Sequence, residues 1–182
     1  SGYSAVLRAG NLKLRSGEAQ AADEFSRTEG GFSRFNFDVN HVSKLSKVTQ
    51  FYIFAHGQLA NRNLDSSEQF YLGGADAVRA YPQGEAGGDS GYQATAELRY
   101  QTPVKGMSMT LFADVGEVLA RKDGDTSDPH RRLAGWGIGA VYSLDRSLYA
   151  RLDYARKIKG ESYRSEAEDK NGRLWFRLYK LF

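Results

Sequence analysis

Residues 71–100 read YLGGADAVRAYPQGEAGGDSGYQATAELRY, and this stretch decides the fold that the sequence predicts. A glycine-rich segment with one central arginine, Arg79, leads into a strand pattern that ends in ELRY at residues 97–100. The charges of that strand fall on one face, because successive side chains of a strand point to opposite faces. This combination is uncommon in soluble proteins. It is typical of a loop that folds back into the lumen of a membrane β-barrel.

The composition is compatible with a membrane barrel, although hydropathy alone would indicate a soluble protein. The chain has 182 residues, 41% hydrophobic and 26% charged, with a mean hydropathy of −0.56. No run approaches the roughly 18–20 apolar residues of a membrane helix. Barrel strands, however, spread their apolar residues over alternate positions. Eleven Tyr and ten Phe would supply aromatic girdles at the two membrane interfaces.

Several classes of site are excluded by the residue types present. The chain has no Cys, so it can form neither a disulfide framework nor a thiolate metal site. Its net charge is +3, and the basic residues are scattered, which argues against a nucleic-acid surface. The three histidines, His41, His56 and His130, have no common spacing, and neither HExxH nor Gly-x-Ser-x-Gly occurs. The sequence therefore predicts no catalytic residue, no metal site and no cofactor.

Period-2 alternation is the main secondary-structure signal. Apolar and polar residues alternate along residues 35–41, 94–100, 107–116 and 148–155. On each of these strands one face could meet lipid and the other could meet water. A β-sandwich would also alternate, with its apolar face toward a core. Alternation alone therefore favours the barrel and the sandwich equally.

The lengths of the connections favour the barrel. Long and short connections alternate between eight predicted strands, and an outer-membrane barrel has long loops on one rim and tight turns on the other. We therefore predict an all-β, antiparallel up-and-down transmembrane β-barrel. The predicted strands are residues 3–15, 31–42, 48–62, 91–102, 107–120, 132–144, 147–158 and 172–182. The long connections are 16–30, 63–90, 121–131 and 159–171, and the short ones are 43–47, 103–106 and 145–146.

Arg79 needs a carboxylate if its loop enters a confined lumen, because an unpaired buried charge is costly. Asp114 is the best candidate, since it lies on the polar face of its strand, two residues after Phe112. A guanidinium can form two parallel hydrogen bonds with a carboxylate, which fixes direction as well as distance. The alternative is an exposed Arg79 and a separate lumen carboxylate.

The remaining strands predict a glycine-lined wall and two distinct faces. Gly137 and Gly139 fall on the lumen face, where the missing side chains leave room for the loop that carries Arg79. Glu97 with Arg99, and Arg151 with Asp153, are expected to form ion pairs on the lumen wall. The full lumen-facing set is Glu97, Arg99, Asp114, Arg151, Asp153 and Arg177, and the lipid-facing set is Leu98, Leu111, Ala113, Trp136, Ile138, Leu152, Phe176 and Leu178.

Two motifs resemble elements of one known group of proteins, the Omp85 superfamily, and a third resembles a feature of outer-membrane proteins in general. Gly73-Gly74 followed by Val78-Arg79-Ala80-Tyr81 resembles its sixth extracellular loop, and Phe112-Ala113-Asp114 resembles the Phe-x-Asp element that receives the loop arginine. The closing strand, with Phe176, Leu178 and the terminal Phe182, resembles the C-terminal recognition strand of outer-membrane proteins. One departure is Ala80, where many members carry Gly. Within the superfamily the chain looks most like the two-partner-secretion transporters of the haemolysin activator/secretion type.

The resemblance implies a fold and an activity. Residues 1–182 would be the C-terminal eight strands of a sixteen-stranded barrel, with residues 63–90 as a loop inserted into the lumen. Two periplasmic POTRA domains and the first half of the barrel would be absent from this chain. The implied activity is export of a haemolysin- or adhesin-like exoprotein across the outer membrane of a Gram-negative bacterium, without nucleotide hydrolysis. The implied partners are that exoprotein, outer-membrane lipid and, during biogenesis, periplasmic chaperones and the barrel-assembly machinery; no nucleic acid is expected.

Two other interpretations remain open from the sequence. One is a membrane-protein insertase of the same superfamily, which would act at a lateral seam of the barrel. The other is a small soluble ligand-binding barrel. Solubility as a monomer without detergent would exclude both membrane interpretations.

Overall fold

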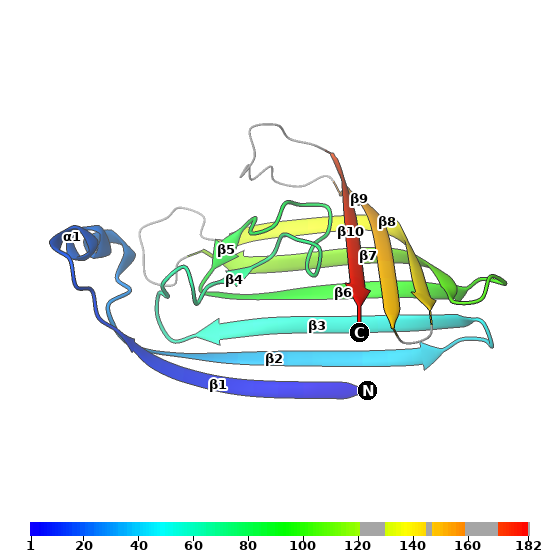
Figure 1. The fold of residues 1–182 in the computed structure, drawn as a ribbon. Helices are drawn as coiled ribbons and strands as arrows, with labels where there is room; N and C mark the ends of the chain where they lie inside the picture. The colour runs from blue at the N-terminus through cyan, green and yellow to red at the C-terminus, as the bar shows by residue number, and fades with distance from the viewer. Residues whose placement is uncertain (121–129, 145–146, 159–170, 182) are drawn as a thin grey trace.

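A computed structural model of the chain describes residues 1–120, 130–144, 147–158 and 171–181 (Figure 1). Eight long strands form one antiparallel sheet in which each strand pairs with its neighbours along the chain. This confirms the predicted all-β, up-and-down order. The strands are β1 (Gly2–Leu12), β2 (Gly30–Lys44), β3 (Thr49–Ala60), β6 (Ser90–Gln101), β7 (Met107–Leu119), β8 (His130–Leu144), β9 (Leu148–Lys157) and β10 (Gly172–Lys180). In the described part of the chain, β1 and β10 are the two edges of this sheet and do not pair with each other.

The alternating sequence gives the sheet two different faces. Leu98, Leu111 and Ile138 follow one another across β6, β7 and β8, and each is at least 39% exposed. The row continues through Tyr154 of β9 to Leu174 of β10, both exposed. An apolar belt therefore runs across five strands on the convex face, where the sequence predicts contact with lipid. The polar residues between these positions point to the concave face.

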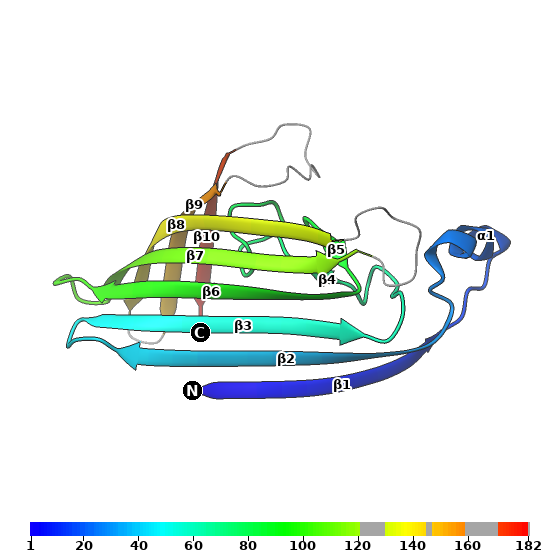
Figure 2. The ribbon, with the colours of Figure 1, turned by 180° about the vertical axis from the view of Figure 1, so that it is seen from behind.

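The core of the protein lies between the concave face and the connection from β3 to β6. This connection, residues 61–89, is called the inserted loop below; it contains two short paired strands, β4 (Phe70–Tyr71) and β5 (Gly87–Gly88). The sheet curls around the loop, so that β10 lies across from β6 and β7 with the loop between them (Figures 1 and 2). The buried apolar cluster combines loop residues Phe70, Leu72, Val78, Ala80, Tyr81 and Ala86 with sheet residues Phe112, Val118, Leu133 and Ala155.

One helix lies within the long connection that the sequence predicts at residues 16–30. Helix α1 spans Gly17–Ser26 within the connection between β1 and β2. The Ser16 side chain accepts a hydrogen bond from the Ala19 backbone N–H at 3.2 Å, which caps the helix start. The helix ends at Arg27, which has a left-handed conformation with φ of 52°. Among the described residues, no helix is long and apolar enough to cross a membrane.

The strand limits differ from the predicted ones mainly at the two ends of the chain. β1 stops at Leu12 rather than residue 15, because the chain turns toward α1. The two described tight turns, near residues 45–48 and 102–106, lie where the sequence predicts them. The predicted turn at residues 145–146, most of the predicted loops at 121–131 and 159–171, and the terminal Phe182 lie outside the described residues.

Candidate functional site

The inserted loop is folded tightly by its glycines. Val78 donates its backbone N–H to the Leu72 carbonyl at 2.8 Å, and Gly73 forms an isolated parallel bridge with Val78. A side chain at Gly73 would collide with the backbone of the loop itself. Gly74 has φ of 141°, a conformation that other residues rarely adopt. The glycines at 73 and 74 therefore let the loop double back and present the next residues to the sheet.

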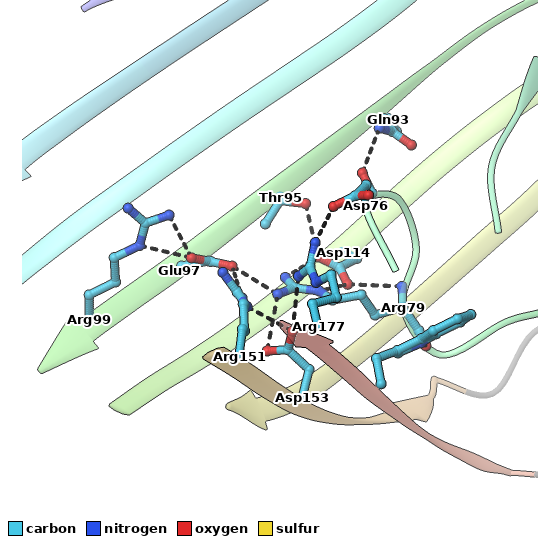
Figure 3. A network of polar contacts seen from close by, with 11 residues as sticks. Asp76, Arg79, Gln93, Thr95, Glu97, Arg99, Asp114, Arg151, Asp153 and Arg177 are labelled. Carbon is cyan, nitrogen blue, oxygen red and sulfur yellow. Dashed lines mark hydrogen bonds and ion pairs between the residues drawn. The ribbon is translucent and has the colours of Figure 1, made fainter. Parts of the chain in front are cut away.

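Arg79 is buried between the loop and the sheet, with 3% of its surface exposed. Its Nε and Nη2 atoms donate to the two carboxylate oxygens of Asp114 at 2.8 and 2.7 Å, so the pair is bidentate (Figure 3). The Arg79 backbone N–H also donates to Asp114, at 3.1 Å. The contact that the sequence predicts is therefore present, and it fixes both the side chain and the backbone of Arg79.

Glu97 is a second acceptor for the same guanidinium. Nη1 of Arg79 donates to Glu97 at 2.8 Å, and Asp153 lies 3.7 Å from the same nitrogen. The Thr95 hydroxyl donates to Asp114 at 2.9 Å and orients that carboxylate. The sequence places Glu97 on the lumen wall but does not identify it as a partner of Arg79. The guanidinium therefore binds β6 and β7 together rather than one strand alone.

The aromatic ring of Phe112 forms the floor of this site. The guanidinium carbon of Arg79 lies 3.3 Å from the Phe112 ring centroid, a cation–π stack. Phe112 has room for this because the next strand has Gly137 opposite it, where an added Cβ would lie 2.5 Å from the ring. Phe112 thus belongs to the site both as packing and as an electrostatic partner.

The glycine wall works differently from the prediction. The sequence assigns the loop contact to Gly137 and Gly139, but the loop rests on Gly135, where an added Cβ would lie 2.6 Å from the Ala80 Cβ. Gly137 instead makes room for Phe112, and Gly139 makes room for the side chains of Asp153 and Thr110. All three glycines lie on the concave face, where the sequence places Gly137 and Gly139, but only Gly135 touches the loop.

Ala80 fits this position without strain. Of the described non-glycine residues, only Arg27 and Ala86 have positive φ, so Ala80 does not need the backbone freedom of glycine. Its side chain is completely buried. The departure from the superfamily pattern at this residue therefore leaves the geometry of Arg79 intact.

Further arginines surround the buried carboxylates. Arg151 donates to Glu97 and to Asp153, at 2.7 Å in each case, and Arg99 donates to Glu97 at 2.8 Å. These are the predicted wall residues, joined into one network instead of two separate pairs (Figure 3). The three carboxylates of Glu97, Asp114 and Asp153 are at most 3% exposed. Burying three negative charges together is tolerable only because several guanidinium groups compensate them.

Strand β10 contacts the loop from the opposite side. The Trp175 indole N–H donates to the Arg79 carbonyl at 2.7 Å. Arg177 pairs with Asp76 of the loop and donates to Asp153 at 3.2 Å. The Lys157 ammonium on β9 lies 4.8 Å from the Tyr81 ring centroid. The sequence predicts that Arg177 faces the lumen, but it gives no signal for the bond between Trp175 and Arg79.

A second group of contacts fixes the base of the loop, and no sequence motif indicates it. Asp89 is fully buried and accepts a hydrogen bond from the Leu64 N–H at 3.0 Å. The Gln58 side chain donates to the carbonyls of Glu68 and Asp89, both at 3.0 Å. Phe70 stacks on His56 with 5.1 Å between ring centroids. The loop is therefore held at its base as well as at Arg79.

The proposed recognition strand is only partly described. Phe176 and Leu178 lie on the convex face and are 65% and 57% exposed, as expected of side chains that meet lipid. Phe182 lies outside the described residues. Within the described ranges, no group of three or more His, Cys, Asp or Glu side chains could hold a metal ion.

Comparison with known protein families gives a match over most of the chain. The family model described as haemolysin secretion/activation protein ShlB/FhaC/HecB matches residues 5–142. The matched region includes the inserted loop and both strands that bind the Arg79 side chain.

Individual relatives agree with the family match. The heme/hemopexin transporter protein HuxB of Haemophilus influenzae, in strains ATCC 51907 / DSM 11121 / KW20 / Rd and 86-028NP, is 32% identical over 111 residues, or 59% of this chain. The chain spans about a fifth of the length of these curated relatives. The solved structure of CdiB from Acinetobacter baumannii superimposes with a TM-score of 0.64 at 20% identity, covering 84% of this chain and 27% of that one. At this identity the likeness shows a shared fold.

Proposed function

We propose that this chain, which belongs to the haemolysin secretion/activation family ShlB/FhaC/HecB, forms the C-terminal part of a sixteen-stranded outer-membrane pore. The pore would export a partner exoprotein by two-partner secretion, with the concave face lining the passage and the convex apolar belt meeting lipid. The inserted loop would shape and gate the passage. POTRA domains and the first eight strands would come from sequence outside these 182 residues.

The observation that carries the proposal is the buried attachment of the inserted loop to the concave face. A loop held there by Arg79, Asp114 and Glu97 occupies space that a translocating chain would need. The attachment is ionic and directional, so a small displacement of the loop breaks several charge-assisted hydrogen bonds at once. Such a contact is suited to a gate with two defined positions.

Family membership favours secretion over membrane-protein insertion, and the exposed apolar belt disfavours a soluble ligand-binding barrel. The nature of the cargo is proposed from similarity. The family description points to a haemolysin-like exoprotein, and the name of the HuxB relatives adds proteins of haem or haemopexin uptake as candidates. No nucleotide hydrolysis and no catalytic residue are proposed. Outer-membrane lipid, periplasmic chaperones and the barrel-assembly machinery are the other proposed partners.

Secretion by the full-length protein tests this function. Arg79→Ala should lower the amount of exoprotein released per unit of correctly assembled pore. Arg8→Ala is a matched control, because Arg8 lies on the concave face of the edge strand β1 and is exposed. Wild-type secretion by Arg79→Ala, at equal pore abundance, would contradict the role of the loop. Recovery of the protein as a detergent-free soluble monomer would contradict the proposed location.

A further inference from the structure

Two opposite parts of the curled sheet hold the same loop residue. The Arg79 side chain is bound by β6 and β7, whereas its backbone carbonyl accepts the indole N–H of Trp175 on β10 at 2.7 Å. Because the loop lies between β10 and strands β6 and β7, these contacts reach Arg79 from both sides of the loop (Figures 1 and 2). The residue at the centre of the buried ion network is therefore also the point at which β10 touches the loop.

β10 makes a second contact with the loop two residues further along the strand, through Arg177. Arg177 is two residues after Trp175, so both side chains point to the concave face while Phe176 points outward. Arg177 reaches Asp76 in the loop and Asp153 on β9. One guanidinium thus joins the loop to the wall next to the Arg79 network.

The position of β10 gives these contacts a particular consequence. β10 pairs with β9 on one side and is an edge of the described sheet on the other. It lies across the curled sheet from β6 and β7, with which it does not pair, and the loop lies between them (Figures 1 and 2). Contacts between the loop and this strand therefore join β10, through the buried Arg79, to strands β6 and β7 on the other side of the loop.

We infer that Trp175 and Arg177 are positioning residues that hold the inserted loop against the residues that bind Arg79, and that they couple the loop to β10. Displacing β10 weakens the hold on Arg79, and releasing Arg79 loosens β10. The two effects are reciprocal, because a coupling free energy acts equally in both directions. The consequence for secretion rests on the proposed function, whereas the coupling itself rests on these contacts alone.

The two contacts are not equivalent. The Asp76 side chain is 83% exposed, and exposed ion pairs contribute little because water screens them. The Trp175 bond is partly buried and meets the backbone of a residue that is itself buried. Most of the coupling should therefore come from Trp175, with Arg177 as the weaker member.

Hydrogen–deuterium exchange of the full-length protein in lipid nanodiscs tests this coupling. Trp175→Phe keeps an aromatic ring and removes only the donor, so amides of residues 72–81 should exchange roughly fivefold faster, the factor expected for one ordinary hydrogen bond. Arg177→Gln should raise the same rates less than Trp175→Phe does. Tyr179→Phe is the matched control on the same face of β10, where Tyr179 packs on Tyr149 rather than on the loop. Reciprocally, Arg79→Ala should speed exchange in β10 more than in β2.

Two results would overturn the inference. One is equal loop exchange in Trp175→Phe and Tyr179→Phe, while Arg79→Ala loosens the loop as expected. The other is an equal increase of the amide exchange rates throughout the sheet in Trp175→Phe, including β1 and β2, since that would indicate general destabilisation of the sheet. Exchange is measured without any cargo, so a failure of the proposed secretion activity would leave this test unaffected.

Discussion

Replacing Arg79 and Asp114, singly and together, tests the central contact most directly. Removing one member of a buried ion pair costs about 3–5 kcal/mol, because the other charge stays buried without full compensation. The structure makes the two single changes unequal. Asp114→Ala leaves Arg79 with two carboxylates, Glu97 at 2.8 Å and Asp153 at 3.7 Å. This substitution should therefore lower the free energy of unfolding by an amount near the lower end of that range.

Arg79→Ala should be the more damaging change. It leaves Asp114 with the Thr95 hydroxyl as its remaining side-chain donor in the described network, and it removes a positive charge shared by three buried carboxylates. Its cost should lie near the upper end of the same range, reduced where water enters the concave face. The double variant should be scarcely worse than Arg79→Ala, which corresponds to a coupling of about 2 kcal/mol or more.

Urea-induced unfolding of the full-length protein in lipid vesicles measures these free energies, and Trp175 provides a fluorescent reporter beside Arg79. Asp114→Asn separates charge from volume, because it keeps the size of the side chain and removes the negative charge. Arg8→Ala, at an exposed position on the same face but outside the Arg79 network, should change the free energy of unfolding little. Single-variant costs that add to within about 0.5 kcal/mol would refute the reasoning, since independent sites behave in that way.

The glycine wall, the convex face and the helix end give the remaining predictions. Gly135→Val should displace the inserted loop and raise its cleavage by protease, with a smaller effect for Gly135→Ala, because an added Cβ has a loop atom only 2.6 Å away. Ile138→Arg should cost about 2–4 kcal/mol in urea unfolding, as for a charge facing lipid, whereas Asn40→Arg on the concave face should cost far less. Hydrogen bonding from the Thr28 hydroxyl, and from nearby backbone N–H groups, holds the pKa of Asp23 well below its ordinary value. The resulting stabilisation is complete above the unfolded-state pKa and is lost only as pH falls through the lower folded-state value. The Thr28 amide NMR signal of the wild type should therefore stay in place from neutral pH to about pH 4, and Asp23→Asn should shift it already at neutral pH.

The strand pattern could be predicted because its signals are local. Period-2 alternation identifies each strand and its two faces, and the alternation of long and short connections orders the strands around a barrel. The pairing of Arg79 with Asp114 needed one further element, the resemblance of two short motifs to a known loop and its receptor. Neither motif alone specifies that the two residues meet.

The helix α1 was missed although its local signals are present. Ser16 is a favoured N-cap residue, and the following residues GEAQAADEF are rich in helix-forming Ala, Glu and Gln. The sequence predicts this segment as a connection, because its neighbours on both sides have the alternating pattern of strands. A loop between strands can contain a short helix without changing the sheet, so the barrel prediction was unaffected.

The partners of Arg79 beyond Asp114 could not be predicted, because they depend on how far the loop reaches along the strands. Arg79 is 18 residues from Glu97 in sequence and 96 residues from Trp175, compared with 35 residues from Asp114. Alternation gives the face of each side chain, but not its height relative to the loop. The same uncertainty explains why the wall contact falls on Gly135 rather than Gly137 or Gly139.

Two kinds of contact hold the loop, and they have different consequences. Leu72, Val78 and Tyr81 are at most 2% exposed, and full burial of an apolar side chain stabilises by about 1.5–3 kcal/mol. Apolar contacts have little directional preference, so they alone would let the loop settle in more than one position. Arg79 adds direction, because its guanidinium group must hydrogen-bond to Asp114 and Glu97 at the same time. The buried ion network contributes little net stability, because the charged groups lose their hydration when they are buried. The apolar residues therefore keep the loop on the sheet, and the ionic cluster fixes where on the sheet it rests.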